Sequence, residues 1–251
     1  GKPRVNPPPL LVGFPSGFPG RAQPAFDPEA QIFADLGFVV ARLNHRSVAG
    51  VKTEDLTALR AAVDRVAVND VLAAIEWIAA RNRPFDRKRI ATLGRGFGGY
   101  LAVRALQLQP TVFRCGIAID APMDLRPWLR AQVTVGAAPS AKAMRDIPAA
   151  LIDHEGVDWK KLSVLDQAEA LTNPVFLLVE PARSPAIDVS TGELRASLQA
   201  LGRTPDHLEL DPGFAAARPE SRAAVYRKIE EFFNLRLHDY GVKIGPPKEV
   251  K

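Results

Sequence analysis

Cysteine is almost absent from this sequence: Cys115 is the only one in 251 residues. An internal disulfide is therefore excluded, and so is a metal site built from several thiolates. The four histidines are scattered and show no His-x-x-x-His spacing of the kind that binds metal ions. We expect no metal ion, and no feature of the sequence requires another cofactor.

Long apolar runs are also missing. No uninterrupted stretch comes near the roughly 18 to 20 residues that cross a bilayer, so we expect no membrane-spanning segment. The 33 basic and 28 acidic residues give a net charge of +5 and are spread along the chain. Because no block of Lys and Arg alternates with aromatic residues, a nucleic-acid-binding surface is not expected either.

The start of the chain gives no targeting signal. Gly1 opens the sequence in place of a methionine, and no signal-like apolar region follows it. We interpret this as a truncated start, so the sequence leaves the cellular location open.

The sequence does contain short apolar runs that alternate with helical patterns. Apolar residues at helical spacing predict helices at 28–36, 57–81, 100–108, around 194–201 and from Pro219 to Leu237, whereas prolines interrupt residues 125–172. The continuous apolar runs predict strands at 10–13, 38–43, 89–93, 116–120, 175–179 and 207–210. This alternation is typical of an α/β fold with a mainly parallel sheet and helices on both faces.

We predict a single domain, since 251 residues can bury a substantial core and no internal repeat divides them. A Pro-rich linker is expected at residues 1–9, the α/β domain at 10–240 and a flexible basic tail at 241–251.

Functional sites of open parallel sheets form at the carboxyl ends of the strands. The sharpest feature at such a position is the run Leu93-Gly94-Arg95-Gly96-Phe97-Gly98-Gly99-Tyr100, between an expected strand and an expected helix. It resembles the nucleophile elbow Gly-x-Ser-x-Gly of α/β-hydrolases, a strained turn that lifts a serine hydroxyl above the sheet.

Further matches in the same order make the resemblance specific. Asn44-His45-Arg46-Ser47 is similar to an Asn-x-Arg-Gly-Ser turn, and Asp86 to Ile90 is similar to an Asp-x-x-Arg-Ile approach to the elbow. Over about residues 9 to 238 the chain resembles the C-terminal hydrolase domain of the prolyl oligopeptidase family, above all its dipeptidyl-aminopeptidase and acylaminoacyl-peptidase branch. The resemblance implies an α/β-hydrolase fold.

The departures from the family pattern lie at its catalytic positions. The elbow serine corresponds to Gly96, the acid to Arg183, and the histidine to Pro212 or Phe214, depending on where a short deletion is placed. Phe14 stands in the family's oxyanion turn and has no hydroxyl to donate. The resemblance therefore implies a degenerate triad with no functional catalytic residue, because without a nucleophile no acyl intermediate forms. We interpret the chain as a catalytically inactive relative with a binding, scaffolding or structural role.

Two other functions stay open. One is a nucleotide-binding module, because Gly94-x-Gly96-x-x-Gly99 follows an expected strand and Asp120 closes the next one. The other is an active serine hydrolase or peptidase that uses relocated residues, for which the loops offer Ser16, Ser47, Ser184, Asp120, Asp124, Asp188 and His45.

Arginines gather in the loops that the fold would bring together. Arg183 would place a cation near Arg46 and Arg95, and such a cluster suits a carboxylate or phosphate. With Phe14 and Phe97 these arginines form the candidate binding set for a small anionic or peptide ligand in the vestigial cleft. Family members often carry a β-propeller before this domain, so the resemblance implies an upstream propeller as a partner; a homo-oligomer is the other possibility.

Overall fold

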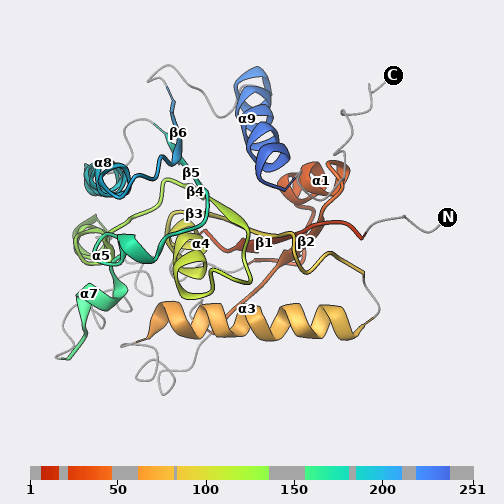
Figure 1. The fold of residues 1–251 in the computed structure, drawn as a ribbon, viewed down its shortest axis with the longest axis horizontal. Coiled ribbons are helices and arrows are strands. Elements are labelled where there is room, and N and C mark those ends of the chain that lie inside the picture. The colour runs from red at the N-terminus through yellow and green to blue at the C-terminus, as the bar shows by residue number, and fades with distance from the viewer. Residues whose placement is uncertain are drawn as a thin grey trace.

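The computed structural model describes residues 7–16, 22–46, 62–81, 84–135, 156–180, 185–210 and 219–237. Within them lies one six-stranded parallel sheet with the strand order β2-β1-β3-β4-β5-β6 (Figure 1). The strands are β1 (Leu10–Phe14), β2 (Val39–Arg42), β3 (Ile90–Arg95), β4 (Cys115–Ile119), β5 (Val175–Val179) and β6 (Asp206–Glu209). The predicted α/β fold with a parallel sheet is confirmed.

Helices cover both faces of this sheet. Those described are α1 (Pro28–Asp35), α3 (Val63–Ala80), α4 (Phe97–Leu108), α5 (Leu125–Val135), α7 (Trp159–Leu162), α8 (Pro185–Ala200) and α9 (Pro219–Leu237), with a short 3₁₀ helix η2 (Ala168–Ala170). Figure 1 shows α3 on one side of the sheet and α1 with α9 on the other.

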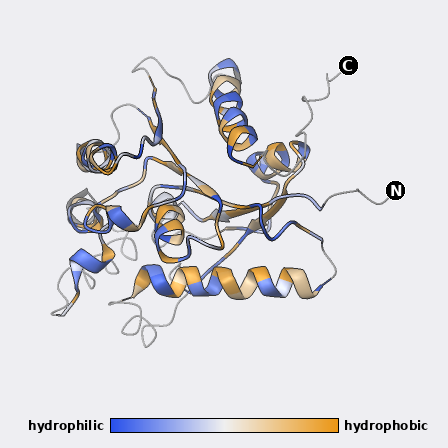
Figure 2. Ribbon diagram, in the orientation of Figure 1, coloured by the Kyte–Doolittle hydropathy of each residue, from blue (hydrophilic) through white to orange (hydrophobic). Residues whose placement is uncertain are grey.

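The alternation of side chains along each strand produces two hydrophobic clusters. Leu10 and Val12 of β1 belong to the cluster formed with α3, α4 and α8, whereas Leu11 belongs to the cluster formed with α1 and α9. Successive side chains of a strand point to opposite faces, so an unbroken apolar run supplies both clusters. The strands are accordingly among the more hydrophobic ribbons in Figure 2.

The boundaries around the glycine-rich turn differ from the prediction. The sequence predicts a strand that ends at Leu93 and a helix that starts at Tyr100, but β3 continues to Arg95 and α4 begins at Phe97. Pairing of β3 with β4 extends the strand, since Gly94 and Arg95 lie opposite Ala118 and Ile119. The turn therefore shrinks to one residue, Gly96.

The segment after β4 is also more regular than predicted. The helix α5 forms there although it contains Pro127. This proline lies in the first helical turn, where no N–H group has a helical acceptor, so it does not break the helix. Among the other predicted helices, 57–81 is described only from residue 62 and forms α3 from Val63 to Ala80.

A buried polar network attaches residues 161–167 to α4. Arg104 forms an ion pair with Asp64 of α3 at 2.8 Å and donates to the carbonyl oxygen of Lys161. Gln107 accepts a hydrogen bond from Arg104 and donates to the carbonyl oxygens of Val164 and Gln167. Since the Arg104 and Asp64 side chains are almost fully buried, each depends on the other for its charge to be compensated.

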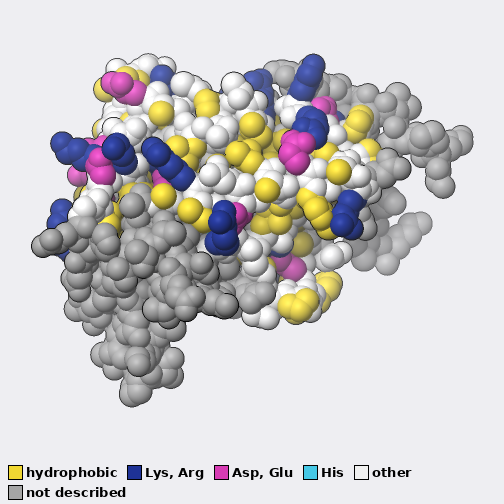
Figure 3. Space-filling model, turned by 90° about the horizontal axis from the view of Figure 1, so that it is seen from below, with side chains coloured by type: hydrophobic (Ala, Val, Ile, Leu, Met, Phe, Trp, Pro, Cys, Tyr) yellow, Lys and Arg dark blue, Asp and Glu magenta, His cyan; other side chains and the backbone are white. Residues whose placement is uncertain are grey.

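The surface on the α3 side mixes charged and hydrophobic side chains, as Figure 3 shows. Trp77 of α3 is 58% exposed, and the guanidinium of Arg81 lies 4.0 Å from the centre of its ring. No helix of the described residues is long and apolar enough to cross a membrane.

Candidate functional site

Gly96 alone makes the turn between β3 and α4. Its φ of +56° and ψ of −126° lie in a region that residues with a side chain rarely adopt and that glycine enters freely. Its N–H group donates to the carbonyl oxygen of Ile119 at 2.8 Å, which ties the turn to β4. The turn thus has the strained backbone expected of a nucleophile elbow, with a hydrogen atom in place of a side chain.

The loop after β1 lies directly against this turn. The chain adds β2 on one side of β1 and then returns to add β3 on the other side, so the topological switch point lies between β1 and β3. Ligands of α/β proteins bind beside such a point. A Cβ atom built on Gly98 would lie 2.4 Å from the carbonyl oxygen of Pro15, and one built on Gly96 would lie 2.9 Å from that of Ser16. The backbone of this loop therefore occupies the space that a side chain at position 96 would enter first.

Close packing also explains the other glycines of the turn. A Cβ on Gly94 would lie 2.1 Å from the carbonyl oxygen of Gly98, and one on Gly99 would lie 2.7 Å from the Cβ of Ala121. Close packing within the turn thus explains the glycines of the Gly94-x-Gly96-x-x-Gly99 string. Binding of a nucleotide to it stays a prediction.

Arg95 connects the carboxyl ends of three neighbouring strands. Its Nη1 atom lies 2.9 Å from a carboxylate oxygen of Asp120 after β4 and 2.6 Å from one of Glu180 after β5. The other oxygen of Asp120 accepts the backbone N–H of Glu180 at 2.7 Å. Asp120 has a φ of +46°, which is strained for a residue with a side chain. The ion pair with Arg95 and the hydrogen bond to the Glu180 backbone hold Asp120 in that conformation.

Arg46 has a carboxylate partner of its own. Its guanidinium and its backbone N–H both donate to Asp70 of α3, with a shortest distance of 2.7 Å. Arg46 and Arg95 are thus each held by protein carboxylates, and a shared anionic ligand for these two residues stays a prediction. Arg183, the third arginine of the predicted set, lies outside the described residues.

The two aromatic members of the predicted binding set belong to the core. Phe14 is 2% exposed, with its ring centre 6.0 Å from that of His45, and Phe97 is 1% exposed and stacks on Tyr100 and Trp128. Phe14 ends the interior strand β1, and Phe97 starts α4 and stacks on Trp128 of α5, so both side chains face the core. Ligand binding by Phe14 and Phe97 stays a prediction, for two side chains that are buried in this structure.

His45 is buried, with 2% of its surface exposed. Among the described residues, neither of its ring nitrogens has a hydrogen-bond partner. Burial lowers the pKa of His45 from 6.5 to about 4, although the nearby Asp70 carboxylate opposes this shift. His45 is therefore neutral at physiological pH, and within the described part of the chain no hydrogen bond joins it to a serine or a carboxylate, as the base of a triad would require.

Most residues at the family's catalytic positions lie outside the described part of the chain. This holds for Arg183, Pro212 and Phe214, and also for Ser47 and Ser184 of the relocated alternative. Of that alternative's described members, Ser16 and Asp188 are exposed, and Asp124 accepts the backbone N–H of Arg126. Among the described residues, no hydrogen bond joins the hydroxyl of Ser16 to His45.

Glu180 is the site residue that the sequence analysis missed. It follows β5 just as Asp120 follows β4 and Arg95 ends β3. Carboxyl ends of parallel strands meet at one edge, so three charged residues at three adjacent strand ends were a usable signal.

Comparisons with known proteins agree on the family. The sequence model of the prolyl oligopeptidase family matches residues 24–235. Dipeptidyl peptidase family member 6 of Caenorhabditis elegans is 23% identical over 231 residues, which cover 91% of this chain and 31% of that protein. Inactive dipeptidyl peptidase 10 of mouse is 24% identical over 143 residues, which cover 49% of this chain and 18% of that protein.

A solved structure extends the likeness to three dimensions. The uncomplexed acylaminoacyl peptidase of Pyrococcus horikoshii superimposes with a TM-score of 0.74 and 25% identity, over 94% of this chain and 38% of that one. The chain thus has the α/β-hydrolase fold of such proteins and spans about a third of the length of the relatives that it matches most fully.

Proposed function

The chain belongs to the prolyl oligopeptidase family, and we propose that it is a member that hydrolyses no peptide and serves instead as a binding, scaffolding or structural domain. In this proposal Gly96, Arg183 and either Pro212 or Phe214 replace the serine, acid and histidine of the triad.

The observation that carries this proposal is the glycine at the elbow. Gly96 has the backbone of a nucleophile turn and no atom that can attack a carbonyl carbon. The carbonyl oxygen of Ser16 lies 2.9 Å from the position that the Cβ atom of a side chain at 96 would take. Two further points support the proposal: no nucleophile of the described residues is hydrogen-bonded to His45, and a relative bears the name inactive dipeptidyl peptidase 10.

Labelling with a fluorophosphonate tests the proposal, because this reagent reacts with activated serines irrespective of substrate preference. We expect no covalent adduct on the intact chain by mass spectrometry, and no release of nitroaniline from dipeptidyl or acylaminoacyl nitroanilides. The acylaminoacyl peptidase of Pyrococcus horikoshii serves as the active control. A stoichiometric adduct on any serine would disprove the proposal, and an adduct on Ser16 would establish the relocated hydrolase in its place.

The substitution Gly96→Ser separates loss of the nucleophile from loss of the whole triad. We expect the variant to stay unlabelled, because a serine without a paired base is a weak nucleophile and a Cβ at this position meets the Ser16 backbone at 2.9 Å. Labelling of the variant but not of the parent chain would mean that a working base survives, and that only the nucleophile is missing.

A further inference from the structure

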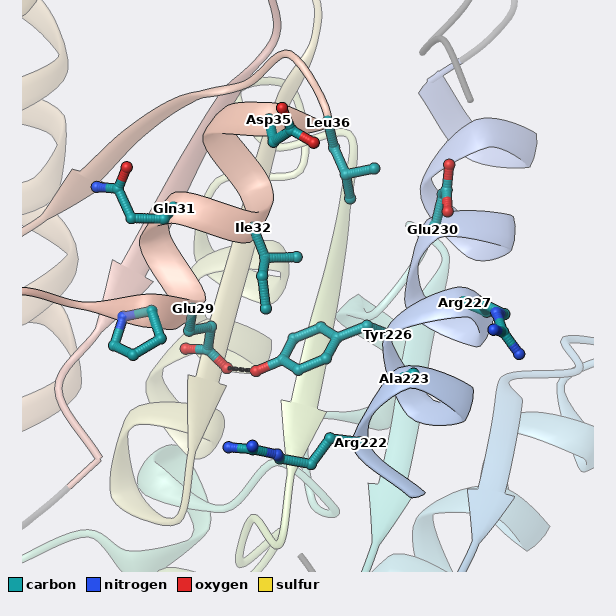
Figure 4. Close-up of a pocket in the computed structure, with 11 residues that line it drawn as sticks. Glu29, Gln31, Ile32, Asp35, Leu36, Arg222, Ala223, Tyr226, Arg227 and Glu230 are labelled. Atoms are coloured by element: carbon teal, nitrogen blue, oxygen red, sulfur yellow. Dashed lines mark hydrogen bonds between the residues drawn. The ribbon is translucent and has the colours of Figure 1, made fainter. Parts of the chain in front are cut away.

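A groove runs between α1 and α9 on the face of the sheet opposite α3. It has a volume of about 670 Å³ and an apolar floor to which Ile32, Leu36, Ala223 and Tyr226 contribute (Figure 4). Sites that bind small molecules have volumes of about 300 to 1,000 Å³ and are lined mainly by apolar side chains. The groove therefore has the size and the lining of a ligand site.

The floor of the groove is held in place. The Tyr226 hydroxyl donates to Glu29 at 3.1 Å, the other carboxylate oxygen of Glu29 binds Arg42, and the Phe33 ring packs edge-on against Tyr226. Burial and the Glu29 carboxylate raise the pKa of Tyr226, so its hydroxyl keeps its proton and its hydrogen bond. A ligand would meet a preformed surface and lose little entropy in ordering it.

The two ends of the groove carry opposite charges. In Figure 4, Arg222 lies at the end that contains Glu29, whereas Asp35 and Glu230 lie at the other end. Among the described residues, the side chains of Arg222, Asp35 and Glu230 make no hydrogen bond or ion pair, unlike Glu29, which is bound at both carboxylate oxygens. One end therefore offers a cation to a ligand, and the other end offers two carboxylates.

The spacing of these charges sets the length of a ligand that can use both ends. Arg222 and Glu230 lie on the same helix, and a rise of 1.5 Å per residue places them about 12 Å apart along its axis. An extended peptide spans about 3.3 to 3.6 Å per residue, so about three or four residues bridge this distance. At pH 7 the free ends of such a peptide carry an ammonium group and a carboxylate.

We infer that this groove binds a short apolar peptide with free termini, about three or four residues long. The peptide carboxylate accepts hydrogen bonds from the Arg222 guanidinium, and the peptide ammonium group donates to Asp35 and Glu230. Its middle side chains cover Ile32, which is 36% exposed, and the ring of Tyr226. Hydrogen bonds between ionised groups are about twice as strong as neutral ones, so the two ends fix the direction of the peptide.

A ligand with a single charge fits the groove less well. A fatty acid matches Arg222, but its chain would lie against Asp35 and Glu230 and take water from their carboxylates without replacing it. A peptide with free ends supplies a partner at both positions. The inference does not depend on the proposed loss of catalysis, because none of the described residues from 94 to 99 lines the groove.

Isothermal titration calorimetry of the full chain with the peptide Ala-Leu-Leu-Ala at pH 7 tests the inference. We expect saturable binding with a dissociation constant below about 1 mM. Acetylation of the amino end or amidation of the carboxyl end should each weaken binding by about tenfold, because each removes one charge-assisted contact. A dissociation constant above about 1 mM would overturn the inference. Equal binding of the doubly capped peptide would also overturn it and would assign the groove to a segment of a longer protein.

Substitutions at the two ends show which end binds which terminus. Arg222→Gln should weaken binding of the free peptide by about tenfold and make amidation immaterial, whereas acetylation should still weaken binding. Asp35→Asn with Glu230→Gln should give the reverse pattern. Arg65→Gln on exposed α3 is the matched control and should bind like the parent chain, and thermal melting checks that every variant folds. Capping effects that are the same in all variants would overturn the inference, and so would a dimer of the chain, seen by sedimentation velocity, that excludes the peptide.

Discussion

The two halves of α4 hold their surroundings by different means. At the start of the helix, Gly98 and Gly99 let the backbone approach Pro15 and Ala121 at distances that no side chain permits. Further along, Arg104 and Gln107 reach out with polar side chains to α3 and to residues 161–167. The first half depends on missing side chains, and the second depends on those that are present.

This difference separates the shape of a site from its chemistry. Backbone packing maintains an elbow without requiring a nucleophile, so the turn keeps the geometry of a hydrolase although glycine occupies position 96. The polar network cannot change so freely, since removal of one buried charge leaves the other without compensation. We therefore expect substitutions in the second half to cost the most stability.

Of the changes that test this comparison, Arg104→Ala is expected to have the largest effect on stability. We expect it to lower the free energy of unfolding by about 3 to 5 kcal/mol, because it leaves the Asp64 carboxylate buried and unpaired. Urea denaturation measures the change. Arg87→Ala is the matched control, because its ion pair with Glu76 is exposed to solvent and should contribute little to stability. Equal losses in the two variants would mean that the network does not carry this part of the fold.

Lowering the pH should destabilise the protein through His45, whose ring lies against Phe14 at the start of the loop that covers the first half of α4. The folded chain keeps His45 neutral down to a pKa of about 4, whereas the unfolded chain protonates it near 6.5. Within this window the unfolded state binds more protons, so stability falls as the pH falls, by up to about 3 kcal/mol, and is unaffected above it. Urea denaturation between pH 7 and pH 4 tests this against His45→Leu, which should lack this part of the loss. A parallel decline in both proteins would assign the effect to other groups.

The fold was predictable from the sequence because unbroken apolar strands between helices leave few alternatives. The boundaries at the elbow were not, since Gly94 and Arg95 have low strand preference and are drawn into β3 by pairing with β1 and β4. Pro127 was misinterpreted because its position relative to the start of α5 decides whether it breaks a helix.

The site was predictable in its location and less so in its contacts. The strand-end rule identified Gly96, Arg95 and Asp120 as residues of one edge, but which carboxylates bind Arg95 depends on strand order, which the sequence analysis did not derive. The inward direction of Phe14 and Phe97 and the approach of the Ser16 backbone to Gly96 are consequences of tertiary packing. No local pattern encodes them.

Gly98→Ala gives the smallest expected loss and tests the first half of α4 directly. Alanine is favoured over glycine inside a helix by about 1 kcal/mol, so intrinsic preference alone predicts a gain. The new methyl group, however, would lie 2.4 Å from the Pro15 carbonyl and 2.7 Å from that of Phe14, and backbone atoms cannot rotate away as a flexible side chain can. We therefore expect a net loss of about 1 to 3 kcal/mol. Gly192→Ala in α8 is the matched control, because nothing lies within 4 Å of its added Cβ, and it should stabilise the protein in the same denaturation experiment. A gain in both variants would show that the loop after β1 yields to a side chain, and that space for a nucleophile at the elbow is more easily recovered than the close backbone packing indicates.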